Sequence, residues 1–105
     1  MRVYIAGPYT KGDVAINVRR AIEVGNAVAE AGHYPFIPHL THFWHVIFPH
    51  EYEFWLAQDN EWLRFCNAII RLDGDSHGAD MEVAMAKARG LEIYHSLEDF
   101  LRLCK

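Results

Sequence analysis

Four short apolar runs alternate along the chain with segments whose apolar residues recur every three or four positions. The runs lie at residues 3–6, 33–39, 67–72 and 91–95. Short apolar runs bounded by turn-forming residues, such as the Gly7-Pro8 pair after the first run, are typical of buried β-strands. Two prolines interrupt the second run, "HYPFIPH". Because proline lacks a backbone N–H, this run is expected at the edge of a sheet or as a short strand.

The segments between the runs have the periodicity of amphipathic helices. Asp13 can cap a helix N-terminus, and apolar residues then recur at helical spacing until Gly32 ends the pattern. Ser96 with Asp99 resembles a capping box that precedes a last helix. The predicted helices lie between Asp13 and Gly32, over residues 51–66, within residues 76–90, and after Ser96.

Strands and helices therefore alternate four times, an order that predicts a parallel sheet covered by crossover helices. We expect one α/β domain over residues 1–105, of Rossmann or flavodoxin-like type, with about four to five parallel strands and helices on both faces. In such folds ligands bind beyond the carboxyl ends of the strands. That rule selects "GPYTKG" after the first strand, "PHLTH" after the second and "DGDSHG" after the third.

Composition narrows the class of function. The chain is 51% hydrophobic and 23% charged, which suits a single globular domain. A net charge of −4 with ten scattered Lys and Arg residues argues against binding of a nucleic acid polymer, which needs a basic stripe. No apolar stretch approaches the roughly 18 residues of a membrane span, and the first apolar run is too short for a signal peptide. Together with two widely separated cysteines, these features predict a cytoplasmic protein without membrane contact.

The segment "SHGADMEVAMAKARG" carries the first candidate for chemistry. Glu82 follows the loop after the third strand, and the residues one helical turn away, Gly78 and Ala86, are small. Either this acid faces water and interacts only with the helix dipole, or it faces a pocket. Asp80, in the same turn of helix, raises the same question.

A second carboxylate interrupts an apolar stripe. On the helix predicted over residues 51–66, one face reads Tyr52, Leu56, Asp59, Leu63 and Cys66. A buried carboxylate is unfavourable unless it is paired or hydrogen-bonded, so Asp59 is either functional or lies partly exposed at the edge of the stripe. Tyr4, inside the first strand, is of a type that usually belongs to the core.

Histidines and aromatic residues are concentrated in the middle of the chain. "HLTHFWH" places His39, His42 and His45 at three-residue spacing, but neither a nearby Cys nor an HExxH pattern accompanies them. We therefore expect no metal, and we predict a loop rich in amphipathic aromatics. Nine of the fourteen aromatic residues lie between residues 34 and 62, as expected for an oligomer interface, for a stacking wall against a flat ligand, or for both. A homodimer or larger homo-oligomer is predicted, with segment 43–55 at the interface.

Three motifs taken together resemble the nucleoside 2-deoxyribosyltransferase family, which includes the 2'-deoxynucleoside 5'-monophosphate N-glycosidases. They are "VYIAGPYTKG", "QDNEWLRFCNAIIRL" and "SHGADMEVAMAKARG", and they span nearly the whole chain in order. The resemblance implies the same α/β fold, a nucleoside or nucleotide as small-molecule substrate, and no cofactor.

The resemblance also implies roles for individual residues. Glu82 matches the nucleophilic glutamate that attacks the anomeric carbon of the sugar. Asp59 matches an aspartate that assists the leaving base or the water, and Tyr4 matches a tyrosine near the reacting centre. Gly7 matches the glycine that ends the first strand and lets the following loop close over the substrate.

Three further matches favour the monophosphate hydrolases. Ser76 matches their phosphate-binding serine, where the transferases tend to carry aspartate, and Gly78 matches a glycine of the same loop. His39 lies where that branch has a histidine. The expected reaction is a retaining cleavage of the N-glycosidic bond through a covalent intermediate on Glu82, resolved by water. Transfer of the sugar to a second nucleobase is the alternative, followed by a non-catalytic nucleotide-binding module and a His-based metal protein.

Overall fold

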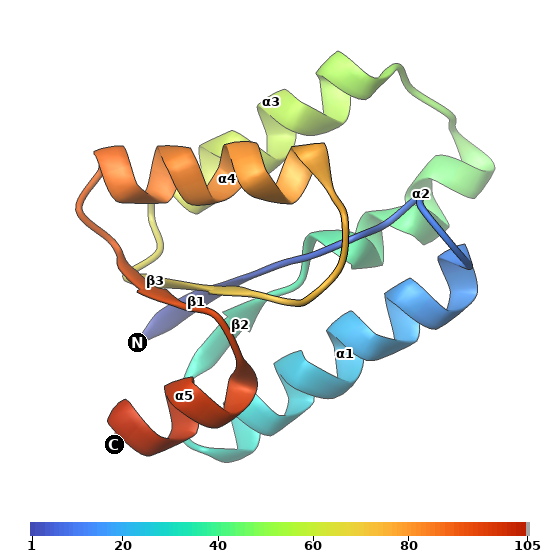
Figure 1. Cartoon of the computed structure of the whole chain (residues 1–105). Helices are drawn as coiled ribbons and strands as arrows, with labels where there is room; N and C mark the ends of the chain where they lie inside the picture. The colour runs from blue at the N-terminus through green and yellow to red at the C-terminus, as the bar shows by residue number, and fades with distance from the viewer. Residues whose placement is uncertain (105) are drawn as a thin grey trace.

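The computed structural model describes residues 1–104 and shows a four-stranded sheet with helices on both faces (Figure 1). The strands are β1 (Arg2–Ala6), β2 (Tyr34–Phe36), β3 (Ala68–Arg71) and β4 (Glu92–Tyr94). Their order across the sheet is β2-β1-β3-β4, and every pairing is parallel. The predicted flavodoxin-like α/β fold is therefore confirmed.

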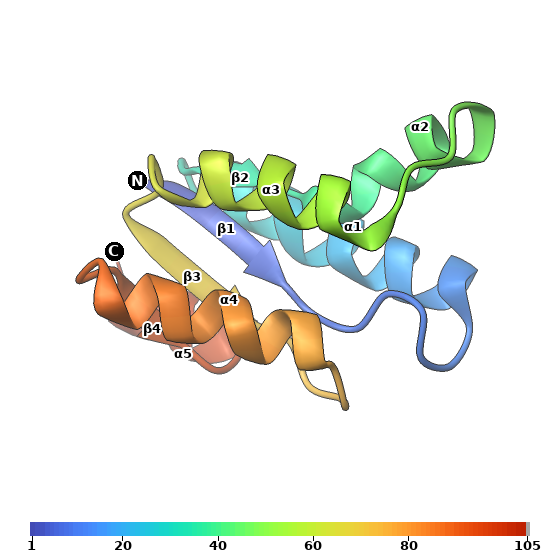
Figure 2. The same cartoon turned by 90° about the horizontal axis from the view of Figure 1, so that it is seen from above.

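Two helical layers enclose this sheet. In residues 1–104 the helices are α1 (Val14–Glu30), α2 (Thr41–Ile47), α3 (Tyr52–Leu63), α4 (His77–Ala88) and α5 (Leu97–Leu103). Helices α1 and α5 cover one face of the sheet and α3 and α4 cover the other, while α2 lies at the end of the molecule opposite the termini (Figures 1 and 2). None of these helices is long and apolar enough to cross a bilayer.

The alternation of side chains along the strands produces two cores. The core beneath α1 and α5 contains Val3, Ile5, Val28, Ile70 and Phe100. The core beneath α3 and α4 contains Tyr4, Ala6, Leu63, Ile69 and Ala86. Because successive strand residues point to opposite faces, Tyr4 lies on the side of the sheet that α4 covers.

The N-caps predicted at Asp13 and Ser96 are confirmed. The side chain of Asp13 accepts a hydrogen bond from the N–H of Ile16 at 3.1 Å, and that of Ser96 accepts one from the N–H of Asp99 at 3.0 Å. Each oxygen satisfies an N–H group that the first helical turn leaves without a partner.

The segment that follows α1, residues 33–47, differs from the prediction. The strand expected over residues 33–39 is shortened to β2, which lies at the edge of the sheet as its prolines indicated, and a 3₁₀ turn (Pro38–Leu40) follows. The prediction of an aromatic-rich loop here is wrong, because Thr41–Ile47 folds as the helix α2. This helix buries none of its residues, and Leu40 provides no side-chain cap. It therefore lacks the two signals by which a helix is recognised in a sequence.

Candidate active site

A cavity of about 460 Å³ lies beyond the carboxyl ends of β1 and β3. The two strands end side by side, with Ala6 paired to Arg71, and their chains then diverge into the β1–α1 and β3–α4 loops. Space between such diverging loops is where parallel sheets bind ligands. Six of the residues singled out in the sequence line this cavity: Gly7, His39, Asp59, Ser76, Gly78 and Glu82.

Tyr4 does not line the cavity itself, but it contacts Glu82, which does. It is fully buried in β1, and its hydroxyl donates a hydrogen bond to Oε2 of Glu82. Glu82 itself is only 7% exposed and lines the cavity, so this acid faces the pocket rather than bulk water.

The two cavity carboxyl groups hold their protons unusually tightly. Burial raises the pKa of Glu82 to about 8; the hydrogen bond from Tyr4 and the charge of Arg71 lower it, and Asp59 raises it further. Burial alone raises the pKa of Asp59 to about 7. Two acids with raised pKa values beside one cavity are typical of sites of acid–base chemistry.

The two acids differ in their hydrogen bonds: Glu82 accepts one from the Tyr4 hydroxyl, and Oδ1 of Asp59 accepts none among the described residues. Burial, together with the neighbouring Glu82 and Asp59 carboxyl groups, raises the pKa of Tyr4, so its hydroxyl stays protonated and donates to Glu82. Oδ1 of Asp59 is buried and has no hydrogen-bond partner among the described residues. Their pKa values of about 8 and about 7 place a shared proton mainly on Glu82, and the Tyr4 bond offsets part of this preference by stabilising the Glu82 anion. The form with the anion at Glu82 and the proton at Asp59 is therefore the less populated one in the empty cavity.

The N-terminus of α4 opens onto the cavity. Ser76 is the N-cap, and its Oγ accepts a hydrogen bond from the N–H of Ala79 at 3.1 Å. The N–H groups of His77 and Gly78, in the first turn, have no partner inside the helix, and both residues line the cavity. Free N–H groups and the helix dipole make this end attractive to an anion.

His39 and Gly7 also line the cavity. Nε2–H of the buried His39 donates to the carbonyl of Pro8 at 2.8 Å, and burial lowers the pKa of His39 despite this bond. Nδ1 is consequently an acceptor, and it has no partner among the described residues. A Cβ on Gly7 would lie 3.0 Å from Cβ of Leu72, so glycine here lets the exits of β1 and β3 pack closely.

The sequence did not identify the aromatic side of the cavity residue by residue. His45, His50, Tyr52 and Trp55 line it, and only the general excess of aromatics in this region indicated their role. Nδ1 of His45 accepts hydrogen bonds from Nε1–H of Trp55 at 2.8 Å and from N–H of His50 at 3.2 Å. Two donors on Nδ1 leave Nε2 as the protonated nitrogen, so His45 can donate to a ligand.

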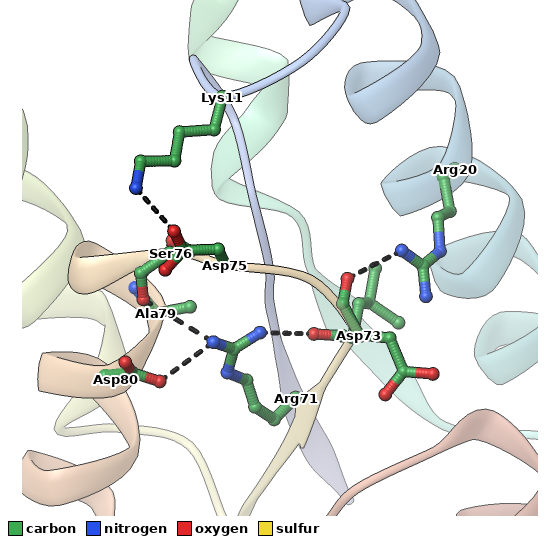
Figure 3. Close-up of polar contacts among 9 residues, drawn as sticks. Lys11, Arg20, Arg71, Asp73, Asp75, Ser76, Ala79 and Asp80 are labelled. Carbon is green, nitrogen blue, oxygen red and sulfur yellow. Dashed lines mark hydrogen bonds and ion pairs between the residues drawn. The ribbon is translucent and has the colours of Figure 1, made fainter.

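An ion pair joins the two loops at the mouth of the cavity (Figure 3). Nζ of Lys11 lies 2.5 Å from Oδ2 of Asp75, and both exposed side chains line the cavity. Exposed pairs of this kind contribute little to stability, so a ligand can compete for the lysine. Nothing in the sequence indicated this pair. Within residues 1–104, no three His, Cys, Asp or Glu side chains are grouped so as to hold a metal ion.

Residues 1–96 match the family described as a domain of unknown function, DUF7768. The structure is similar to that of a 2-deoxyribosyltransferase from the psychrotolerant bacterium Bacillus psychrosaccharolyticus, with a TM-score of 0.64 and 19% sequence identity. That match covers 89% of this chain and 69% of the other. No curated protein matches the chain in sequence. At this identity the structural similarity establishes the fold.

Proposed function

The chain belongs to the DUF7768 family, and from the geometry of its cavity we propose that it cleaves the N-glycosidic bond of a nucleoside or nucleoside 5'-monophosphate. The observation that carries the proposal is the buried Glu82, held by the Tyr4 hydroxyl in the same cavity as the unpartnered Asp59. The fold shared with a 2-deoxyribosyltransferase supports chemistry at the same kind of bond.

In the proposed reaction Glu82 is the nucleophile, and the reactive form is the one in which Glu82 is ionised and Asp59 holds the proton. Its carboxylate attacks the anomeric carbon as the bond to the base breaks, which forms a covalent glycosyl ester on Glu82. Asp59 donates its proton to the leaving base. A water molecule then attacks the same carbon and gives a proton back to Asp59, which frees Glu82. Two successive inversions leave the anomeric configuration retained.

The start of α4 is the proposed site of a 5'-phosphate. The N–H groups of His77 and Gly78 and the hydroxyl of Ser76 supply donors, and Lys11 supplies a positive charge at the mouth. Asp80 does not oppose this anion directly, since its carboxylate contacts the guanidinium of Arg71 at 2.8 Å. A monophosphate is therefore the preferred substrate in this proposal.

The base is proposed to lie against the aromatic side of the cavity. Trp55 and Tyr52 offer flat apolar surface there, and Nε2–H of His45 offers a donor to an acceptor on the edge of the base. Trp55 precedes Asp59 by about one helical turn on α3, which suits a base whose leaving nitrogen takes its proton from Asp59.

The test is a chromatographic screen of nucleosides, deoxynucleosides and their 5'-monophosphates for released base. Glu82→Gln should lower release by about a thousandfold or more, and the wild type should form a glycosyl adduct on Glu82 that mass spectrometry detects. Glu53→Gln, on the exposed side of α3, is the matched control and should keep full activity. Full activity in a folded Glu82→Gln protein would refute the proposal.

A 2-deoxyribosyltransferase is the second candidate, favoured by the structural similarity. In that case a second base, rather than water, would attack the glycosyl ester on Glu82. The same screen distinguishes the two reactions when an acceptor base is added. A new nucleoside formed faster than free sugar would support transfer, whereas free sugar at an unchanged rate would support hydrolysis.

A further inference from the structure

Arg71 has a position that the proposed reaction does not yet use (Figure 3). It is the last residue of β3, its side chain is only 14% exposed, and it lies on the side of the sheet that α3 and α4 cover. Its guanidinium donates to the carbonyl of Leu72, to the carbonyl of Ser76 at 3.5 Å, and to Oδ1 of Asp80 at 2.8 Å. Its neighbour in β1 is Ala6, whose small side chain leaves it room.

We infer that Arg71 is a positioning residue of the active site and that Asp80 is its counter-charge. The guanidinium contacts both ends of the β3–α4 loop, Leu72 at its start and Ser76 at its end. It thereby fixes the loop that carries Ser76 to the cavity, and it places a positive charge on the side of the sheet where Glu82 lies. The inference rests on the proposed function for the role of Glu82, but not for the contacts themselves.

The groups that act on Glu82 come from three neighbouring elements: the Tyr4 hydroxyl of β1, the Asp59 carboxyl of α3 and the Arg71 guanidinium of β3. Asp80, on α4 itself, contacts Arg71. Burial raises the pKa of Glu82, and Arg71 lowers it as the one cation among these groups. Since Asp80 is bound to Arg71, its negative charge offsets part of that effect. Burial is the largest influence on the ionisation of Glu82, and the balance between Arg71 and Asp80 adjusts it.

This balance separates an electrostatic role from a merely structural one. Arg71→Met and Asp80→Asn both remove the same ion pair, so a purely structural pair would make both variants change in the same direction. The charge changes are opposite, however. Arg71→Met should move the ionisation of Glu82 to higher pH, and Asp80→Asn should move it to lower pH.

The experiment follows the carboxyl carbon of Glu82 by NMR in protein labelled with 13C-glutamate, assigned by its absence in Glu82→Gln. Wild type, Arg71→Met, Asp80→Asn and Arg20→Met are titrated with pH. Arg20 is the matched control, because its guanidinium donates to the carbonyl of Asp73 in the same loop at 2.8 Å but comes from α1, on the opposite face. Its midpoint should equal that of the wild type.

Midpoints that move in the same direction, or do not move, would overturn the inference. Asp80 is 68% exposed, so Asp80→Asn will fold and decides the question even where Arg71→Met does not. Arg71→Lys keeps the charge without the planar donors, and it should keep the midpoint near that of the wild type.

Measuring kcat/KM for base release on the same proteins separates this inference from the proposed function. At a pH below the Glu82 midpoints of both the wild type and a variant, the kcat/KM of the variant should be about tenfold lower for each pH unit by which its midpoint is higher. Shifted midpoints without base release from any substrate would support the role of Arg71 and overturn the proposed function. If kcat/KM for base release declined at the same acid pH in all variants, although the Glu82 midpoints differ, Glu82 would be refuted as the nucleophile.

Discussion

At the scale of single residues, burial makes two ordinary carboxyl groups into acids that keep a proton near neutral pH. The pKa of Glu82 rises to about 8 and that of Asp59 to about 7, both mainly because burial in the protein removes water from around them. A protein that holds such groups is less stable when they ionise. Its tolerance of pH is therefore tied to the residues that serve its proposed chemistry.

The free energy of unfolding should accordingly fall as pH rises from about 5 to about 8.5. Both groups have raised pKa values in the folded state, so their stabilising effect is complete below their ordinary values of 4.5 and 3.8 and is lost as pH passes about 7 and about 8. Urea unfolding across this range measures the effect. Glu82→Gln and Asp59→Asn should each flatten the dependence and Glu53→Gln should not. Wild-type stability that rises with pH would contradict the argument.

Ser76 should affect phosphate and nucleoside substrates differently. Loss of a hydrogen bond to a charged group costs roughly 1.5–3 kcal/mol, or about 10- to 150-fold in affinity. Ser76→Ala should therefore lower kcat/KM for the monophosphate by about that factor and leave the bare nucleoside nearly unchanged. Ser96→Ala is the matched control, because Ser96 caps α5 as Ser76 caps α4. Each variant should lose about 1 kcal/mol of stability, but only Ser76→Ala should alter the preference between substrates.

Some site residues could be predicted from the sequence and others could not. Glu82 follows a strand loop and Asp59 interrupts an apolar stripe, so both stand out against a local pattern. Lys11 and Arg71 are ordinary charged residues in their segments. Their partners are fixed by how two loops and a helix approach one another, and this depends on the order of strands in the sheet rather than on any local signal.

At the scale of elements, the sequence predicted every segment that packs against the sheet. Periodicity arises when one face of a helix is buried, as in α1 and α4. Helix α2 covers no part of the sheet and leaves Val46 and Ile47 exposed, so its sequence has no reason to show a polar face and an apolar face. Its helical conformation could be recognised only in the folded chain.

The β3–α4 loop gives a prediction at this scale. Gly74 has φ of +119°, and a Cβ there would lie 2.7 Å from Cγ of Pro8, whose carbonyl also accepts the hydrogen bond of His39. Gly74→Ala therefore adds a steric contact to backbone strain of about 1–3 kcal/mol. Gly12→Ala is the control, since Gly12 has φ of +84° but open space around it. Urea unfolding should show a larger loss for Gly74→Ala. Equal losses would mean that the contact with Pro8 is unimportant.

At the scale of the whole molecule, exposed apolar side chains collect at one end. Helix α2 and the residue after it expose Phe43, Trp44, Val46, Ile47 and Phe48, and α2 lies at the end opposite both termini (Figure 1). Contiguous apolar surface on a small protein is typical of a site of association. His45, on the same helix, lines the cavity, so an association here would adjoin the proposed active site.

The protein should therefore form a homodimer or larger homo-oligomer in solution through α2. Ile47→Glu should shift the mass measured by light scattering to that of the monomer, because it places a charge in the apolar contact. Leu103→Glu is the matched control, at 62% exposure on α5 against 70% for Ile47, and should leave the oligomer intact. A monomeric mass for the wild type at high concentration would contradict the prediction.

The edge strand β2 limits how copies of this fold can meet. The N–H of Tyr34 donates a hydrogen bond to the carbonyl of Met1 at 2.8 Å, on the side of β2 that faces β1. Successive N–H groups of a strand point to opposite sides, so the residue that would present a donor outward is Pro35, which has none. An incoming strand therefore finds no N–H to accept from within β2, and growth of the sheet into a fibre is blocked at this border.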